Sequence, residues 1–379
     1  MRNLFIFLFA FSSLLLQAQS FVQIGSLPPP ITDVDYDQNG VRFAISQDGK
    51  VYKGETQILT VPCLMNNEFG LVGLEVKGSN LYFHVSGVDT VQRVISYNLK
   101  STLYDTLVEV SYKTIPFAYN HVGGDIVISD GYLYCSFGYG IIDLAAQELT
   151  NYRGKLLAIN LEDKSIGIAS FGLRNPFRFD VDGEYAYIGD VGSKPSVQQP
   201  WEFEEINYFN PYQDTLINYG WPCFEGDSIR PSHPQELCEE YEPVYPIYTY
   251  TANPSRAITG GVFWQDNWYF CDQYTRKGGY VDTNWHVTII DGVFPAFVTG
   301  MTVNPLSDKL ILCNYNGKIY QYVPPIIVND PKVPPGGTRS QRGLQTGFID
   351  MYGEYWTAPP TTGIYYVIEE GRTHFIFIK

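Results

Sequence analysis

The segment Lys309–Tyr322 reads KLILCNYNGKIYQY and contains a pattern that recurs through the chain. An apolar run, Lys309–Cys313, precedes the polar turn Asn316-Gly317-Lys318, and a second apolar run ends at Tyr322. Two runs rich in apolar and aromatic residues on either side of an Asn-Gly turn predict an antiparallel β-hairpin. The segment therefore predicts one unit of an antiparallel β fold.

Five similar pairs of strand-like runs precede this segment. They are Val41–Ile45 with Lys50–Lys53, Leu81–Val85 with Val94–Leu99, Leu133–Phe137 with Lys155–Leu161, Tyr185–Ile188 with Glu205–Tyr208, and Trp268–Cys271 with Gly279–Val281. Six units in residues 21–324 are about 51 residues each, which is typical of propeller blades. No helical periodicity of useful length appears. We therefore predict an all-β fold, a six-bladed β-propeller, with two β-sandwich domains as the alternative.

The composition agrees with strands and turns. The 379 residues include 35 Gly and 24 Pro, and 16% are aromatic. Lys and Arg number 25 against 40 Asp and Glu, which gives a formal charge of −15. Nucleic acids and anionic membranes need clustered cations, so the composition argues against both as partners.

The N-terminus has the pattern of a secretory signal peptide. Arg2 precedes an apolar run, Leu4–Leu16, and small or polar residues follow up to Ser20. We predict that residues 1–20 are removed on export to the periplasm, the cell surface or the medium; an N-terminal anchor is the alternative. No later run of 18 apolar residues predicts a membrane span.

Six cysteines would then lie where disulfides persist. Cys223 and Cys238 flank a Pro-rich, acidic insertion without a core of its own, so we predict a disulfide between them, with about 3 kcal/mol of entropic stabilisation. Cys271 and Cys313 occupy matching places in neighbouring units and are either paired across blades or buried thiols. Two other cysteines, Cys63 and Cys135, are expected to be unpaired.

A Pro- and Gly-rich linker is predicted over residues 325–345, followed by a β tail over residues 346–379. The tail contains Gly347–Gly353 and Thr362–Ile368 and ends at Lys379. Its strand order and basic end resemble a shortened C-terminal sorting domain of the type IX secretion system, which would make that machinery a partner. A small β tail packed on the propeller is the alternative.

Four motifs in the middle of the chain follow one another in a fixed order. They are FGLRNPFRF at Phe171–Phe179, YIGDVG at Tyr187–Gly192, EEIN at Glu204–Asn207 and NYGWP at Asn218–Pro222. Further matches are EFGLVGL at Glu68–Leu74, HVGG at His121–Gly124, RGK at Arg153–Lys155 and AITGG at Ala257–Gly261. This set, over roughly residues 25–322, resembles the glucose/sorbosone dehydrogenase family. The resemblance implies an exported six-bladed propeller that oxidises a sugar with pyrroloquinoline quinone (PQQ) and Ca²⁺.

The resemblance also implies roles for individual residues. Oxidation at an anomeric carbon needs a base for the hydroxyl proton, and a neutral imidazole suits that role. His121 matches the family's catalytic histidine. Arg174 and Asn175 match positions that contact PQQ, a tricarboxylate, and Lys277, or alternatively Arg276, could supply another cation. The alternatives are a structural histidine and a buttressed Arg-Asn-Pro turn.

Calcium prefers oxygen ligands, including backbone carbonyls. The family's catalytic Ca²⁺ is bound in the loop before the Glu-Ile-Asn motif, where Pro200 and Trp201 match. Its second Ca²⁺ region matches Glu205 and the carbonyl of Tyr219. A solvated strand end is the alternative for Glu205.

The chain departs from the family's pattern at two places. Gly138-Tyr139 stands where the family has Gly-Asp, and Phe294–Asn304 contains neither of the arginines expected to bind PQQ carboxylates. Each lost charge-assisted hydrogen bond would cost roughly 1.5–3 kcal/mol. Two main hypotheses follow: a sugar dehydrogenase that delivers electrons to an external acceptor, or a non-catalytic propeller that binds carbohydrate or a protein partner. A Ca²⁺-dependent lactonase is a third.

Overall fold

The computed structural model describes residues 20–112, 120–193, 203–213, 216–230, 238, 241–251, 257–290 and 292–324, together with four strands after residue 346. Contacts within the chain divide it into two units. One is Phe21–Tyr322 and the other contains the residues from Val323 onward. The first unit carries all the candidate site residues.

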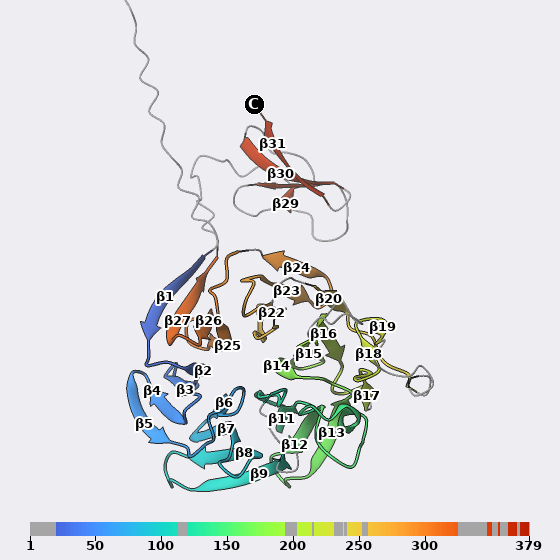
Figure 1. The fold of residues 1–379 in the computed structure, drawn as a ribbon. Coiled ribbons are helices and arrows are strands. Elements are labelled where there is room, and N and C mark those ends of the chain that lie inside the picture. Colours follow the sequence, from blue (N-terminus) through green and yellow to red (C-terminus); the bar gives the residue numbers. More distant parts are fainter. Residues whose placement is uncertain are drawn as a thin grey trace, which may run out of the picture. The chain divides into compact units, whose positions relative to one another are not determined.

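Six four-stranded antiparallel blades make up the first unit, arranged in a ring (Figure 1). In chain order, five blades consist of consecutive strands, apart from short inserted elements. They are β2 (Ile31–Tyr36), β3 (Arg42–Ser46), β4 (Lys50–Lys53) and β5 (Thr56–Thr60); β6 (Leu71–Lys77), β7 (Asn80–Ser86), β8 (Val91–Asn98) and β9 (Tyr104–Ser111); β10 (Ile126–Ser129), β11 (Tyr132–Phe137), β12 (Lys155–Asn160) and β13 (Ile166–Phe171); β14 (Pro176–Asp182), β15 (Tyr185–Asp190), β16 (Glu204–Phe209) and β20 (Tyr248–Tyr250); and β21 (Val262–Trp264), β22 (Asn267–Cys271), β23 (Gly278–Asp282) and β24 (Val287–Ile290).

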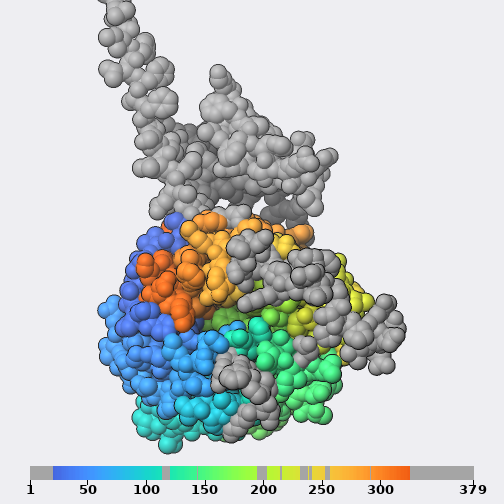
Figure 2. Space-filling view, viewed as in Figure 1, coloured from blue at the N-terminus to red at the C-terminus, as the bar shows by residue number. Residues whose placement is uncertain are grey.

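The sixth blade closes the ring. It combines β25 (Val298–Asn304), β26 (Lys309–Asn314) and β27 (Lys318–Val323) with the N-terminal strand β1 (Ser20–Ser26). Figure 2 shows the blue N-terminal and orange C-terminal segments of the propeller side by side. Hydrogen bonds between β1 and β27 join the first and last strands of the propeller in one blade and so close the ring.

The remaining elements are short. β17 (Ile217–Asn218) adds a parallel fifth strand beside β13, β18 (Phe224–Glu225) pairs with β19 (Ser228–Ile229), and a 3₁₀ turn spans Asp143–Ala146. The tail forms its own sheet of β28 (Gly347–Asp350), β29 (Tyr355–Trp356), β30 (Gly363–Glu369) and β31 (Arg372–Ile378), in the order β29-β28-β30-β31.

The predicted six-bladed propeller is confirmed, and the alternative of two sandwiches is wrong. No helix in the described part of the chain has the length and hydrophobicity of a membrane span.

Carboxylates on the inner strands link each blade to the next. The Asp125 carboxylate accepts the backbone N–H of Phe179 at 2.9 Å, and the Asp180 carboxylate accepts that of Phe263 at 2.7 Å. These groups line a cavity of about 190 Å³ between the inner strands. The inner edge of each first strand has no neighbouring strand to accept its backbone N–H groups. Carboxylates of the adjacent blade accept some of these N–H groups instead, and the cavity is acidic for this reason. Similar links connect Asp33 with Leu74 and Asp35 with Val76.

Burial raises the pKa of Asp180 to about 7, far above its usual value. Between about pH 4 and pH 7 the folded protein therefore holds a proton that the unfolded chain has released. We expect the free energy of unfolding of the protein, relative to the Asp180→Asn variant, to fall by a few kcal/mol as the pH rises through this range. Denaturant titrations at several pH values test this expectation. The exposed Glu55, changed to Gln, is the control and should give a flat difference.

Candidate active site at one end of the propeller

Segments that enter the first strands of neighbouring blades bring the principal candidates together. His121 precedes β10, and Arg174 and Asn175 precede β14, so all three lie at the same end of the propeller. The His121 Nε2 and Arg174 Nη2 atoms are 3.2 Å apart. The Asn175 side chain accepts the backbone N–H of Gly123 at 3.0 Å, so the His121–Gly124 and Arg174-Asn175 segments are connected directly.

Glu68 holds His121 from the opposite side. Its Oε2 atom accepts the backbone N–H of His121 at 2.6 Å, and its Oε1 atom lies 3.8 Å from His121 Nδ1. A guanidinium only donates, so Nε2 must accept from Arg174, and the proton of the neutral imidazole is then on Nδ1, facing Glu68. Burial raises the pKa of Glu68, opposed by the N–H of His121 and the charge of Arg174. The arrangement fixes the ring and makes Nε2 the proton acceptor.

Tyr139 is the residue that the sequence resemblance places opposite a carboxylate of the family. Its ring stacks on that of His121, with centroids 5.5 Å apart and an angle of 17° between the planes. Tyr139 is only 8% exposed, and its ring meets the edge of Trp221 at 5.3 Å. Tyr139 is therefore an aromatic support for the imidazole ring of His121.

Trp221 lies between two guanidinium groups. The Arg230 guanidinium is 3.9 Å from the centre of the Trp221 ring, and that of Arg174 is 5.3 Å from it. Trp221 is 4% exposed. These contacts give it a packing role, because its ring is not accessible to a sugar.

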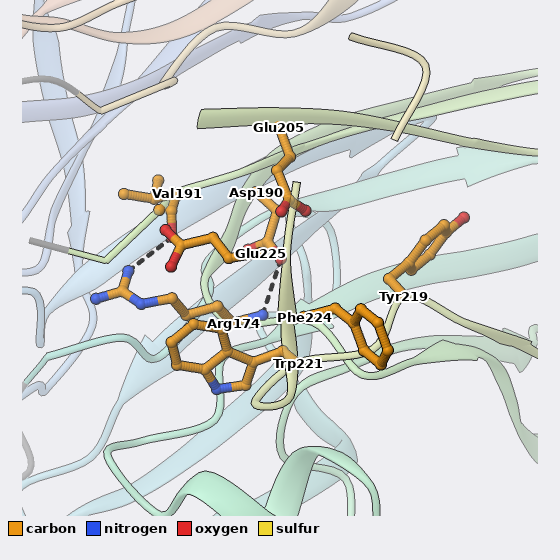
Figure 3. A pocket seen from close by; sticks show the side chains of 9 residues that line it. Arg174, Asp190, Val191, Glu205, Tyr219, Trp221, Phe224 and Glu225 are labelled. Atoms are coloured by element: carbon orange, nitrogen blue, oxygen red, sulfur yellow. Dashed lines mark hydrogen bonds between the residues drawn. The ribbon is translucent and has the colours of Figure 1, made fainter. Parts of the chain in front are cut away.

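Arg174 and Asn175 are held in place by Asp190. Both backbone N–H groups donate to its carboxylate, at 2.8 and 2.6 Å. The Arg174 guanidinium donates to the Val191 carbonyl at 2.6 Å, as Figure 3 shows. Arg174 is 6% exposed, and its Nε has no hydrogen-bond partner in the part of the chain that the structure describes. A buried, unpartnered N–H is costly, so this donor is suited to an anionic or carbonyl ligand.

Three carboxylates line a small cavity beside Arg174, namely Asp190, Glu205 and Glu225. Tyr219 lines it too, and its volume is about 10 Å³. Burial and the nearby Asp190 charge raise the pKa of Glu205 well above its usual range, and burial raises that of Asp190 to about 6. Glu205 and Tyr219, two of the predicted calcium ligands, both line this cavity. Among the described residues, however, no group of three or more His, Cys, Asp or Glu side chains has the geometry of a metal site.

Three predicted site residues remain, namely Pro200, Trp201 and Lys277. Pro200 and Trp201 lie outside the described residues. Lys277 is exposed on the turn between β22 and β23, and the described residues include no contact between it and His121 or Arg174. Its role stays a prediction.

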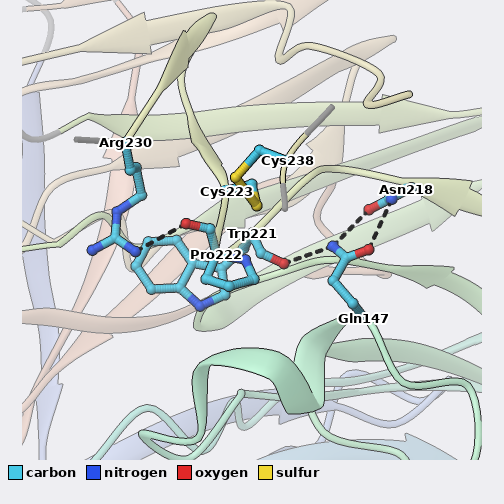
Figure 4. Close-up of a disulfide and its surroundings, with 7 residues drawn as sticks. All are labelled: Gln147, Asn218, Trp221, Pro222, Cys223, Arg230 and Cys238. Atoms are coloured by element: carbon cyan, nitrogen blue, oxygen red, sulfur yellow. Dashed lines mark hydrogen bonds between the residues drawn. A yellow bond between two sulfur atoms is a disulfide. The ribbon is translucent and has the colours of Figure 1, made fainter. Parts of the chain in front are cut away.

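The predicted disulfide between Cys223 and Cys238 is confirmed, with 5.4 Å between the Cα atoms (Figure 4). It follows directly on Trp221-Pro222, where Gln147 donates to the Trp221 carbonyl and Arg230 donates to the Pro222 carbonyl at 3.0 Å. The disulfide therefore anchors the insertion beside the ring that supports Arg174. The other four cysteines are free thiols, and three of them, Cys135, Cys271 and Cys313, are buried.

Sequence reasoning missed three side chains of this site. Glu68 begins the EFGLVGL motif, to which no chemical role was assigned. Glu225 and Arg230 lie in the insertion between Cys223 and Cys238. The only available signal for Glu68 was its acidic character immediately before a buried strand. Its contact with His121 spans 53 positions and depends on the ring of blades.

Comparisons with solved structures show that the propeller fold is shared with sugar dehydrogenases. No family model matches the chain, and no curated protein matches its sequence. Similar solved structures include an oxidoreductase of Thermus thermophilus provisionally classified as a glucose dehydrogenase, with 16% identity, a TM-score of 0.66, and 81% of this chain and 100% of that chain covered.

Two further solved structures are described as aldose sugar dehydrogenases. The PQQ-bound enzyme of Streptomyces coelicolor has 16% identity and a TM-score of 0.63, with 80% of this chain and 98% of that chain covered. The apo-form of the soluble enzyme of Escherichia coli has 14% identity and a TM-score of 0.63, with coverage of 81% and 100%. The likeness, at this level of identity, concerns the fold. The chain thus has the six-bladed propeller fold of the soluble glucose and aldose sugar dehydrogenases.

Proposed function

We propose that this protein is an exported, PQQ- and calcium-dependent sugar dehydrogenase that oxidises an aldose at its anomeric carbon to the lactone. The observation that carries the proposal is the position of His121, whose Nε2 atom accepts a hydrogen bond from Arg174 while Glu68 holds the ring. The shared propeller fold supports it. Electrons would leave to an external acceptor.

His121 would act as the base. The C1 hydroxyl of the sugar would replace the Arg174 N–H as donor to Nε2, and Nε2 would take its proton as the C1 hydride departs. Glu68 would stabilise the imidazolium that forms, because its carboxylate faces the Nδ1 side of the ring. Tyr139 would keep the ring plane fixed during this transfer.

Arg174, Asn175 and Lys277 would hold PQQ. The Arg174 Nε supports this assignment, because it offers a buried donor for which the described residues provide no acceptor. When bound, PQQ would supply the hydride acceptor. Asp190 would keep Arg174 and Asn175 at the mouth by accepting their backbone N–H groups.

Calcium is the proposed counter-ion of this acid-rich site. Glu205 and the Tyr219 carbonyl are the proposed ligands of one ion, and the Pro200 and Trp201 carbonyls those of a second. The carboxylates around the cavity beside Arg174 repel one another when ionised, and a hard divalent cation would relieve that repulsion.

Residues 1–20 and the tail are proposed to direct export. The leader would take the chain across the inner membrane, and residues 346–379 would be recognised by type IX secretion machinery. Cleavage at the end of the leader, read by N-terminal sequencing of the exported protein, tests the first step. Retention of a tail-less variant in the cell tests the second.

A non-catalytic propeller that binds carbohydrate or a protein is the second candidate. The observations that favour it are Tyr139, packed on His121 in place of a carboxylate, and the absence of Arg and Lys from Phe294–Asn304. In that case Arg174 would remain hydrogen-bonded to His121, and PQQ would not bind.

A titration of the purified protein with PQQ in millimolar Ca²⁺ separates the two candidates. We expect saturable changes in quinone absorbance and, with aldoses added, reduction of an artificial dye acceptor. An Arg174→Lys variant should bind PQQ at least tenfold more weakly, because Lys offers a point charge in place of the planar fork. Absence of binding at high micromolar PQQ would favour the non-catalytic candidate.

Calcium should stabilise the protein in the absence of PQQ. We expect the melting temperature to rise with Ca²⁺ concentration, because an ion that binds only the folded state stabilises it by mass action. In Glu205→Gln this rise should be lost, while Glu55→Gln, an exposed carboxylate elsewhere, should retain it. An unchanged calcium response in Glu205→Gln would remove Glu205 from the proposed ligands.

A further inference from the structure

Three exposed aromatic side chains lie at the same end of the propeller as His121. Strands alternate in direction, so the start of each first strand and the end of each second strand meet at one end. Tyr274 follows β22, Phe297 precedes β25 and Tyr315 follows β26, which places all three at the end where His121 precedes β10. Their exposed fractions are 50%, 41% and 38%.

Backbone hydrogen bonds tie the three residues into one surface, which we call the aromatic rim. The Phe297 N–H donates to the Gln273 carbonyl at 2.9 Å, and the Tyr315 N–H donates to the Phe297 carbonyl at 2.9 Å. The rings of Tyr274 and Phe297 meet edge to face, with centroids 6.2 Å apart. The rim is therefore a fixed surface shared by two neighbouring blades.

Phe297 is held there against its own conformational preference. Its φ is 60°, in the left-handed region that a bulky side chain rarely adopts. This strain costs of the order of 1–3 kcal/mol, and the side chain does not regain it by full burial. The backbone thus holds the ring of Phe297 beside that of Tyr274 instead of in the core.

The aromatic rim is connected to the His121 site by a short path of hydrogen bonds. The Tyr315 hydroxyl donates to Gln47 Oε1 at 2.7 Å, and the buried Gln47 donates to the Phe69 carbonyl at 3.0 Å. Glu68, the neighbour of Phe69, accepts the backbone N–H of His121. These hydrogen bonds thus connect the rim with the segment that holds the candidate base.

The size and chemistry of the rim favour a saccharide over a protein. Three aromatic side chains of about 150–250 Å² each, half exposed or less, offer roughly 200–350 Å². A stable protein interface buries about 800 Å² per partner. Pyranose rings present C–H faces that pack on aromatic rings, and their hydroxyls can bond to a nearby polar group such as the Gln273 side chain.

We propose that Tyr274, Phe297 and Tyr315 form a subsite for the second and later sugar units of an oligosaccharide whose reducing end lies at His121. The inference rests on the proposed function, because oxidation at the anomeric carbon places the reducing end at the base. The remaining units must then extend across the mouth of the propeller, where the aromatic rim lies. The substrate class is accordingly an oligosaccharide.

Calorimetric titration of the cofactor-free protein tests the subsite without requiring oxidation. The probes are maltopentaose, cellopentaose and xylopentaose, each compared with its monosaccharide. We expect at least one pentaose to bind at least tenfold more tightly than its monosaccharide, and this preference to be lost in Phe297→Ala and Tyr274→Ala. Trp285→Ala is the matched control, since Trp285 is also exposed, also has a positive φ of 65°, and lies in the β23–β24 turn at the opposite end.

The outcomes separate the subsite from the proposed function. Pentaose binding that depends on the rim, without any dye reduction in the presence of PQQ, would retain the subsite and reject the dehydrogenase. Dye reduction with equal KM for pentaoses and monosaccharides, unchanged in Phe297→Ala, would retain the dehydrogenase and overturn the subsite. Equal loss of binding in Trp285→Ala, or no preference for any pentaose, would also overturn it.

Discussion

The His121→Ala variant is expected to lose about 10²–10⁴-fold in kcat for sugar oxidation and to keep its affinity for PQQ. General base catalysis contributes a factor of this size, and Arg174 and Asn175, the proposed cofactor ligands, are anchored by Asp190 independently of the imidazole. Steady-state dye reduction and the PQQ titration measure the two quantities separately. A variant that loses PQQ affinity and keeps kcat would assign His121 to cofactor binding instead.

Glu68→Gln provides a more specific test of how His121 is held. The amide keeps the size of the side chain and removes the negative charge facing Nδ1. We expect a smaller loss of kcat and a shift of the acidic limb of the kcat/KM profile to lower pH, because the imidazolium is no longer stabilised. His286, whose side chain is 80% exposed, is the control histidine, and its change to Ala should alter neither quantity. An unshifted pH profile in Glu68→Gln would leave Glu68 with a purely structural role.

The sequence was sufficient to predict the propeller because its signals are local. Asn316-Gly317 and similar turns mark hairpins within a few residues, and the spacing of the units gives the number of blades. The Cys223–Cys238 disulfide was predictable for the same reason, since both residues flank one short insertion. In each case the interacting residues are close along the chain.

The site was only partly predictable because its contacts cross the ring. His121 and Arg174 could be proposed from motifs, but Glu68 contacts His121 across 53 positions, and Tyr315 contacts Gln47 across 268. Closure of the ring by β1 and β27 brings such distant positions together. No local pattern around Gln47 or Tyr315 carries that information.

Arg178 is the clearest residue of this kind, and its replacement should cause the largest loss of stability. Its side chain is 2% exposed and lies between the carboxylates of Asp33 and Asp125, at 3.3 and 2.9 Å. It also donates to three carbonyls, those of Thr299 at 2.8 Å, Thr32 at 2.8 Å and Val72 at 3.1 Å. One guanidinium on β14 therefore connects five of the six blades.

Arg178→Leu should lower the free energy of unfolding by about 3–5 kcal/mol or more, because two buried carboxylates lose their counter-charge and three carbonyls lose their donor. Thermal and denaturant unfolding measure the loss. Arg178→Lys retains the charge but offers three donors in place of five, so it should be intermediate. Arg93→Leu makes the same change at an ion pair with Asp89 and Glu109 whose side chains are 25–54% exposed, and it should cost no more than about 1 kcal/mol. Equal losses at Arg178 and Arg93 would show that the ring is held by its strand pairing and apolar packing alone, without this buried ionic link between blades.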